Sequence, residues 1–341
     1  MSPELIVCGI LIAAITLYAI LGGADFGAGV WEFNLAMRAS KKERDLMYRA
    51  IGPVWEANHV WLIFAIVLMF SAFPVAFAAL SRALWVPLLL ALLGIFARGI
   101  GFAFRAYAAG AVRQQALFGA VFAFASTSTP FFFGACAGSI AAGLPVDASG
   151  QFTGDHLTGW ISPLSFFCSF YAVGLCSYIA AIFMSREAQS DGDLELMSAW
   201  RRRALTMGVI LGAFSVLGLF IVTGSAPDLW QGFRNSALPL VALSGASGFA
   251  SMLCVWKSKY QLAVAASSLT VGSVILGWGV AQYPMIIPPE ISVQTSKTED
   301  SVLWAMVYVI GAGSVVLLPA LGWLFFLFKG QLPKSNKAGA A

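Results

Sequence analysis

Three ionisable side chains stand beside or inside long apolar stretches in the first third of the chain. Asp25 lies in a glycine-rich run, Glu56 opens a second apolar stretch, and Arg98 lies within a third. If these stretches cross a membrane, burying each charge costs roughly 2.5–3.5 kcal/mol on insertion scales, so each one needs a reason. Two carboxylates and one guanidinium that meet would carry one surplus negative charge, or hold one exchangeable proton.

The composition places these residues in a membrane protein. Of the 341 residues, 59% are hydrophobic and only 11% are charged, against about 25% charged in ordinary soluble domains. A soluble globule of this size needs more polar cover than that. The composition therefore excludes a soluble enzyme, a secreted disulfide scaffold and a disordered chain. The net charge of +4 comes from connections between apolar runs, which argues against a nucleic-acid partner.

Apolar stretches of roughly 20 residues indicate membrane-spanning helices. The sequence predicts nine, at about 5–24, 57–80, 84–104, 115–141, 160–184, 204–223, 237–256, 260–283 and 303–328. Placing the N-terminus outside puts most of the 20 Lys and Arg residues in inner segments, as the positive-inside rule requires. We therefore predict an all-α fold with an outer N-terminus and a cytoplasmic C-terminus. Residues 1–329 are expected to form a single membrane domain, followed by a short polar tail at 330–341.

The predicted depths of the three charged residues in the membrane indicate that they form one cluster. Asp25 closes an inward-running span, and Glu56 opens the next, outward-running one. Arg98 follows Arg82 by sixteen residues, or roughly 24 Å along a helix. All three are therefore expected in the inner half of the membrane, where pairing would lower the cost of burial.

Plainer interpretations remain open for each feature. Asp25 and Glu56 could mark water-facing helix ends, and Arg98 could extend toward the cytoplasmic surface. His59, three residues after Glu56, is more often a packing residue than a haem ligand. The glycines around Asp25 could break a helix, as in transporter binding sites, or let a neighbouring helix approach closely; the second use is the more frequent one.

The cysteines and histidines give no sign of a metal site. All five cysteines lie in apolar runs without a Cys-x-x-Cys pair, which is typical of small buried hydrophobic residues: Cys8, Cys136, Cys168, Cys176 and Cys254. The chain has two histidines, His59 and His156. That scarcity limits the redox chemistry that the chain could host alone.

The first third of the chain, about residues 1–114, resembles subunit II of the cytochrome bd family of bacterial quinol oxidases. The resemblance rests on an ordered series of motifs: GADFGAG at 23–29, Arg44 in a basic segment, GPVWEANHVWL at 52–62, FSAFP at 70–74 and RGIGF at 98–102. The remainder agrees in length, number of spans and orientation.

The resemblance implies a fold, partners and a location. Subunit II of the family has nine helices in two four-helix bundles plus a peripheral helix. It forms a heterodimer with a subunit I that holds the b-type and d-type haems, in the bacterial plasma membrane. It binds no haem itself. The complex oxidises quinol and reduces oxygen to water, and the family allows for a structural quinone and a small extra subunit.

The resemblance also implies roles for individual residues. Asp25 and Glu56 match acidic positions on a proton route toward the haems, and Arg98 matches an arginine beside it. Asn58 and His59 neighbour that route, and Trp61 matches a tryptophan near the oxygen-access tunnel. Two positions depart from the family pattern: Gly22 stands where an acidic residue is usual, and Glu56-Ala57-Asn58 replaces Asp-Gly-Asn. These departures indicate a divergent subgroup.

The leading hypothesis is a haem-free subunit of a terminal quinol oxidase that conducts cytoplasmic protons through Asp25 and Glu56. One alternative is a secondary transporter with an ion or substrate site at Asp25. Another is a purely structural assembly subunit, in which all three charges serve packing.

Overall fold

The computed structural model describes residues 2–35, 40–51, 55–107, 112–147, 149–155 and 157–330. Nearly all of this chain is helical, as the apolar stretches predict. The long helices are α1 (Pro3–Leu35), α3 (Trp55–Ala72), α5 (Trp85–Tyr107), α6 (Val112–Ala142), α7 (Pro163–Ser190), α8 (Leu194–Ser225), α10 (Leu238–Trp256), α11 (Tyr260–Gln282) and α13 (Asp300–Gly330).

Within the described residues, eight helices are long and apolar enough to cross a membrane, or nine if α3 and α4 (Pro74–Ala83) form one span. Large apolar side chains such as Phe124, Phe220 and Val315 are exposed on the outside of the bundle. Such a surface suits lipid rather than water. The prediction of a polytopic membrane protein is thereby confirmed.

The expected span over 57–80 is wrong as one continuous helix. The chain breaks at Phe73, and α3 and α4 are bent by 118° relative to one another. Pro74 is the first residue of α4, where its missing N–H group and fixed φ angle favour a new helix over the continuation of the old one. Hydropathy alone does not register this turn.

Two other helices are longer than their apolar stretches. The expected span over 5–24 is α1, which continues to Leu35, and the one expected over 204–223 is α8, which begins at Leu194. Both extensions carry charged residues at the same end of the bundle, including Glu32 and Arg203. A helix does not have to end where its apolar stretch ends, because packed neighbours can keep charged turns helical.

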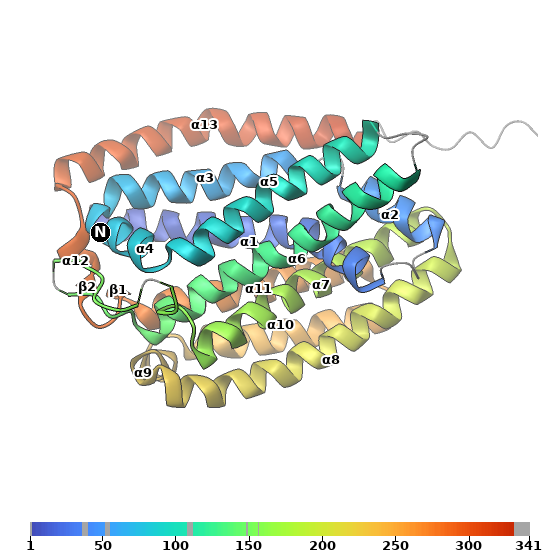
Figure 1. Cartoon of the computed structure of the whole chain (residues 1–341). Coiled ribbons are helices and arrows are strands. Elements are labelled where there is room, and N and C mark those ends of the chain that lie inside the picture. Colours follow the sequence, from blue (N-terminus) through green and yellow to red (C-terminus); the bar gives the residue numbers. More distant parts are fainter. Residues whose placement is uncertain are drawn as a thin grey trace, which may run out of the picture.

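The long helices lie roughly side by side (Figure 1). Helices α1, α3, α5 and α6 form one group and α7, α8, α10 and α11 a second, joined where α1 and α6 pack on α7. Helix α13 lies along one edge, against α1 (Figure 1). The arrangement matches two groups of four helices plus a peripheral one.

Short elements cover the two ends of the bundle (Figure 1). One end carries the N-terminus, α4, α9 (Pro227–Asn235), α12 (Val293–Ser296) and an antiparallel hairpin of β1 (Met285–Ile287) and β2 (Ile291–Ser292). The other end carries α2 (Lys41–Ile51) and the turn between α7 and α8, and is called the α2 end below. The expected positive-inside orientation makes the α2 end the cytoplasmic one.

Candidate functional site

Asp25 is the centre of a buried polar cluster that joins three helices. Its Oδ2 accepts a hydrogen bond from the Asn58 amide of α3 at 2.7 Å. The same oxygen lies 3.7 Å from an Arg98 guanidinium nitrogen of α5. The two charged side chains are only 8% and 2% exposed. Burial of this degree makes opposite charges and hydrogen bonds necessary, since an uncompensated ion in a dry site is strongly destabilising.

Asn58 links the Asp25 carboxylate to the preceding turn of α1. The amide nitrogen that donates to Asp25 also donates to the Leu21 carbonyl at 3.3 Å. One side chain of α3 therefore contacts two successive turns of α1. Asn58, which was expected to be a neighbouring residue, thus contacts the predicted carboxylate directly.

Aromatic rings surround the guanidinium of Arg98. Its Cζ atom lies 4.8 Å from the centre of the Phe26 ring and 5.4 Å from the centre of the Phe122 ring. Such cation–π contacts are worth about 2 kcal/mol or more when desolvated. The side chain is fully buried, so it does not extend to the cytoplasmic surface, and that interpretation of Arg98 is wrong.

The glycines after Asp25 serve close packing. A Cβ at Gly27 would overlap the Cys176 carbonyl of α7 and lie 2.7 Å from the Ala180 Cβ, and one at Gly29 would overlap Ser126 of α6. Helix α1 runs unbroken through these positions. The small residues therefore let α6 and α7 approach α1 next to Asp25, and the broken-helix interpretation does not hold.

The second predicted carboxylate, Glu56, lies in the first turn of α3, but its side chain lies outside the described part of the structure. His59 of the same helix packs its ring against Tyr18 and Phe26, with centroids 6.0 and 6.1 Å apart. Trp61 contacts Phe64 at 6.5 Å between ring centroids. The motif thus supplies Asn58 to the cluster and aromatic packing around it.

A second acid–base pair, which the sequence did not single out, lies nearer the α2 end. Glu32 of α1 and Arg105 of α5 form an ion pair at 2.7 Å, with both carboxylate oxygens within hydrogen-bond distance of the same nitrogen. Each residue follows its counterpart in the first pair by seven positions. That repeat on two helices was a signal in the sequence, but Glu32 was placed outside the first span.

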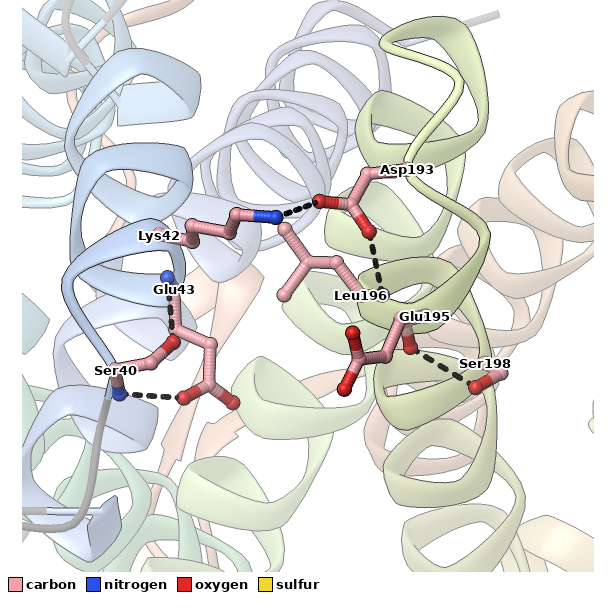
Figure 2. A network of polar contacts seen from close by, with 7 residues as sticks. All are labelled: Ser40, Lys42, Glu43, Asp193, Glu195, Leu196 and Ser198. Carbon is pink, nitrogen blue, oxygen red and sulfur yellow. Dashed lines mark hydrogen bonds and ion pairs between the residues drawn. The ribbon is translucent and has the colours of Figure 1, made fainter.

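Helix α2 is fastened to α8 by polar contacts at its end of the bundle (Figure 2). Lys42 donates to Asp193 at 3.1 Å, and Asp193 accepts from the Leu196 backbone N–H at the start of α8. Glu43 accepts from the Ser40 backbone N–H at 2.7 Å, a reciprocal capping contact. These bonds hold α2 across the ends of α1 and α7.

Contacts at this end of α2 lower the pKa values of two carboxylates, Asp193 and Glu43. The Leu196 backbone N–H and then Lys42 hold the pKa of Asp193 below its ordinary value. At Glu43, burial raises the pKa, but the hydrogen bonds from Ser40 and Arg203 outweigh it and lower the pKa overall. Both carboxylates are therefore kept ionised by donors to their charged form.

No group of three or more His, Cys, Asp or Glu residues that could hold a metal ion occurs among the residues described. The five cysteines are free thiols and are buried or half-buried. His156 lies outside the described residues. The cluster around Asp25 therefore offers charge, hydrogen bonds and a titratable carboxylate rather than a metal-ligand set.

Comparisons with known proteins agree with this architecture. Residues 3–328 match the family model for cytochrome bd terminal oxidase subunit II. The chain is 24% identical to the cytochrome bd ubiquinol oxidase subunit 2 of Bacillus subtilis (strain 168), over 95% of both chains. It is 23% identical to the cytochrome bd-I ubiquinol oxidase subunit 2 of Escherichia coli (strain K12), over 94% of this chain and 92% of the relative.

A solved structure shares the fold. The bd oxidase from Geobacillus thermodenitrificans superposes with a TM-score of 0.81, covering 97% of this chain and 100% of that chain at 20% identity. The resemblance carried by the motifs at 23–29, 52–62 and 98–102 thus extends along nearly the whole sequence. The chain belongs to the cytochrome bd terminal oxidase subunit II family.

Proposed function

We propose that this chain is the haem-free membrane subunit of a quinol oxidase, and that it conducts protons from the α2 end toward haems held by a partner subunit. In this proposal Asp25 and Glu56 carry the proton, and Arg98 sets the charge balance. Residues 1–329 act as one membrane domain beside a haem-bearing subunit I, with which the chain forms a heterodimer in the bacterial plasma membrane. Family membership supports the partner and the reaction.

The buried Asp25 carboxylate is the observation that carries the proposal. A relay group must gain and lose a proton at low cost, and opposing effects provide that balance. Burial favours the neutral acid, while Arg98 at 3.7 Å and the amide of Asn58 at 2.7 Å favour the carboxylate. A carboxyl group whose neutral and charged forms are both stabilised by its surroundings fits proton transfer better than an ordinary structural ion pair does.

Haem chemistry belongs to the partner in this proposal. When bound there, the haems supply electron transfer and oxygen reduction. In this chain, His59 packs against Tyr18 and Phe26 rather than within a set of ligands. The contribution of the chain is to bind its partner, exclude water around Arg98 and deliver protons through carboxylates. Quinol and lipid are its small-molecule neighbours, with a structural quinone and a small extra subunit as further components.

A purely structural role is the second candidate, and the packing around Arg98 favours it. The two aromatic rings beside the guanidinium and the close approach of α7 at Gly27 would stabilise the bundle without any proton transfer. A secondary transporter with its site at Asp25 has less support, because α1 is continuous at that residue.

Two steps test the proposal. First, the chain is purified in mild detergent, where a co-purifying coloured polypeptide is expected and a colourless homo-oligomer would favour transport. Second, Asp25→Asn and Glu56→Gln are assayed in the assembled complex. Measured per haem of the complex that assembles, each is expected to cut quinol-driven oxygen consumption by at least about tenfold with an unchanged haem spectrum. Normal turnover in both variants would leave only the structural role.

A further inference from the structure

Helices α1 and α5 present two matching acid–base pairs on facing sides. Asp25 and Glu32 are seven residues apart on α1, and Arg98 and Arg105 are seven apart on α5. Because seven residues make almost two helical turns, both members of each set lie on one face, roughly 10.5 Å apart along the axis. The two pairs therefore bridge α1 and α5 at two different depths.

The outer pair is the more accessible of the two. Glu32 and Arg105 are 14% and 19% exposed, against 8% and 2% for Asp25 and Arg98. The outer pair also lies nearer the α2 end, which carries the basic segments. The exposure of the paired side chains thus falls from the predicted cytoplasmic side toward Asp25. This is the order that a path for protons from water requires.

Residues of α6 and α2 lie beside the outer pair. On α6, Gly119 faces the pair, and a Cβ there would lie 3.5 Å from Glu32 Oε1 and 3.8 Å from Arg105 Cζ. On α2, the Tyr48 ring lies 5.9 Å from Arg105 Cζ, and the Arg44 charge acts on Glu32. The carboxylate therefore meets positive charge from α5 and α2, and a glycine of α6 lies beside it.

A buried hydroxyl lies between the two pairs. Ser126 of α6 packs directly on Gly29, which lies one turn from Asp25 and one turn from Glu32 on the same face of α1. The Ser126 hydroxyl is inaccessible to solvent and has no hydrogen-bond partner among the described residues. An unsatisfied buried hydroxyl costs about 1–3 kcal/mol, so its retention beside two carboxylates needs a reason.

Phe122 restricts any alternative path between the pairs. It is buried, it approaches Gly29 and Gly101, and its ring faces Arg98. This apolar side chain therefore lies between α1 and α5, next to Arg98. Ser126, which also packs on Gly29, places a polar hydroxyl next to α1 at this depth.

We infer that the Glu32–Arg105 pair is the entrance of the proton path, and that the Ser126 hydroxyl relays protons between Glu32 and Asp25. This inference rests on the proposed function. Glu32 takes a proton from cytoplasmic water and releases one inward through a short chain of water. Ser126 accepts that proton on its oxygen while donating its own toward Asp25, so no net charge stays on the hydroxyl. Arg105 holds Glu32 in position and balances its charge.

The test uses the assembled complex with three variants, each with a matched control where the chain offers one. Glu32→Gln removes the entrance carboxylate, and Glu43→Gln is its control, because Glu43 forms a comparable partly buried pair with Arg203 at 2.6 Å at the same end. Ser126→Ala removes the relay, and Ser185→Ala is its control, because Ser185 is equally buried but bonded to the Ala181 carbonyl at 2.8 Å. Asp25→Asn reports on the proposed function itself.

Oxygen consumption is measured from pH 6 to pH 8.5 together with the haem spectrum and the solvent deuterium isotope effect. Glu32→Gln is expected to slow turnover by at least about tenfold at pH 8.5 and much less at pH 6, since collecting protons becomes limiting when they are scarce. Ser126→Ala should raise the isotope effect. Both control variants should match the parent complex in pH profile and isotope effect.

The outcomes separate the two proposals. If Asp25→Asn slows turnover while Glu32→Gln keeps the parent pH profile, the entrance is elsewhere and the inference fails alone. If Asp25→Asn turns over normally, Asp25 does not carry the proton, and the inference fails together with that part of the proposed function. A loss at Glu32 that is equal at every pH, or that also appears in Glu43→Gln, would mark a structural role and overturn the inference.

Discussion

The Asn58 amide donates to the Asp25 carboxylate at 2.7 Å across the contact between α3 and α1. The two residues come from two of the motifs on which the resemblance to the family rests, GADFGAG and GPVWEANHVWL. The first motif supplies a buried acid, and the second supplies the donor that keeps it in place.

Asn58→Leu should therefore weaken both stability and turnover. A hydrogen bond to a charged group is worth about 1.5–3 kcal/mol, and leucine of similar size offers no donor. The expected result is a lower thermal midpoint of the assembled complex and slower oxygen consumption. The control is Asn34→Leu, because Asn34 is an exposed α1 residue whose amide donates to the Val30 carbonyl of its own helix. An unchanged midpoint in Asn58→Leu would mean that the contact does not hold Asp25.

The Asp25–Arg98 pair predicts strongly non-additive mutations. Removing one partner of a buried ion pair leaves an uncompensated charge and costs about 3–5 kcal/mol, whereas an apolar replacement of both is far less damaging. Arg98→Met is expected to assemble poorly, and the double variant Asp25→Asn with Arg98→Met to recover much of the complex. Chemical unfolding of all four proteins measures the coupling free energy. Additive losses would show that Asp25 and Arg98 do not interact.

The close approach of α7 to α1 predicts that alanine substitutions at two glycines of α1, Gly27 and Gly22, have very different effects on stability. Gly27→Ala would force its Cβ into the Cys176 carbonyl, whereas a Cβ at Gly22 would lie 3.5 Å from the nearest Tyr18 ring atom, an ordinary contact. Overpacking costs typically 1–3 kcal/mol. Yield and thermal midpoint of the complex should therefore fall for Gly27→Ala and stay near the parent value for Gly22→Ala. Equal behaviour would place α7 further from α1.

Gly22 also bears on the departure from the family pattern. The resemblance implies an acidic residue there, whereas a Cβ at Gly22 would meet the Tyr18 and Phe26 rings at 3.5 and 3.7 Å, which are ordinary contacts. The Tyr18 hydroxyl is buried, with no hydrogen-bond partner in the described ranges. The polar groups along this face of α1 are thus a phenol, Asp25 and Glu32, at intervals of seven residues.

Hydropathy predicted most of the fold because every long helix must be apolar enough to lie in the same lipid bilayer. The boundaries of the helices at 237–256 and 260–283 were predicted within a residue or two, since Lys257 and Lys259 separate the two helices and Pro284 follows the second. The turn at Phe73-Pro74 was not predicted, because apolar residues continue on both sides of it. Hydropathy records the transfer of side chains into lipid and carries no information about chain direction.

The site was accessible to sequence reasoning only where a charge stood in an apolar run. Asp25 and Arg98 stand out in that way, and the structure places them together. Glu32 and Arg105 do not, since both lie near the helix ends where charge is ordinary. Their pairing depends on α1 continuing to Leu35, and that continuation depends on packing of Gly27 and Gly29 against α7 and α6, which are distant in the sequence.

The fastening of α2 predicts loosening at acid pH. Asp193 accepts from the Leu196 N–H and from Lys42, and Glu43 accepts from Ser40 and Arg203, so both have pKa values below their ordinary 3.8 and 4.5. A carboxylate whose folded pKa is lowered stabilises the folded state above its unfolded pKa, and that stabilisation is lost as the pH falls through the folded pKa. Contacts between α2 and α8 should therefore hold at neutral pH and weaken below about pH 4.

Hydrogen–deuterium exchange of α2 peptides in the assembled complex measures this loosening. After correction for the intrinsic pH dependence of exchange, protection of residues 42–48 should fall between pH 5 and pH 3 while protection of α10 stays constant. The variant combining Asp193→Asn with Glu43→Gln should show low protection of α2 at every pH, because its side chains no longer titrate in this range. A pH-dependent loss that persists in this variant would assign the acid response to other carboxylates, of which Glu32 beneath α2 is the next to replace.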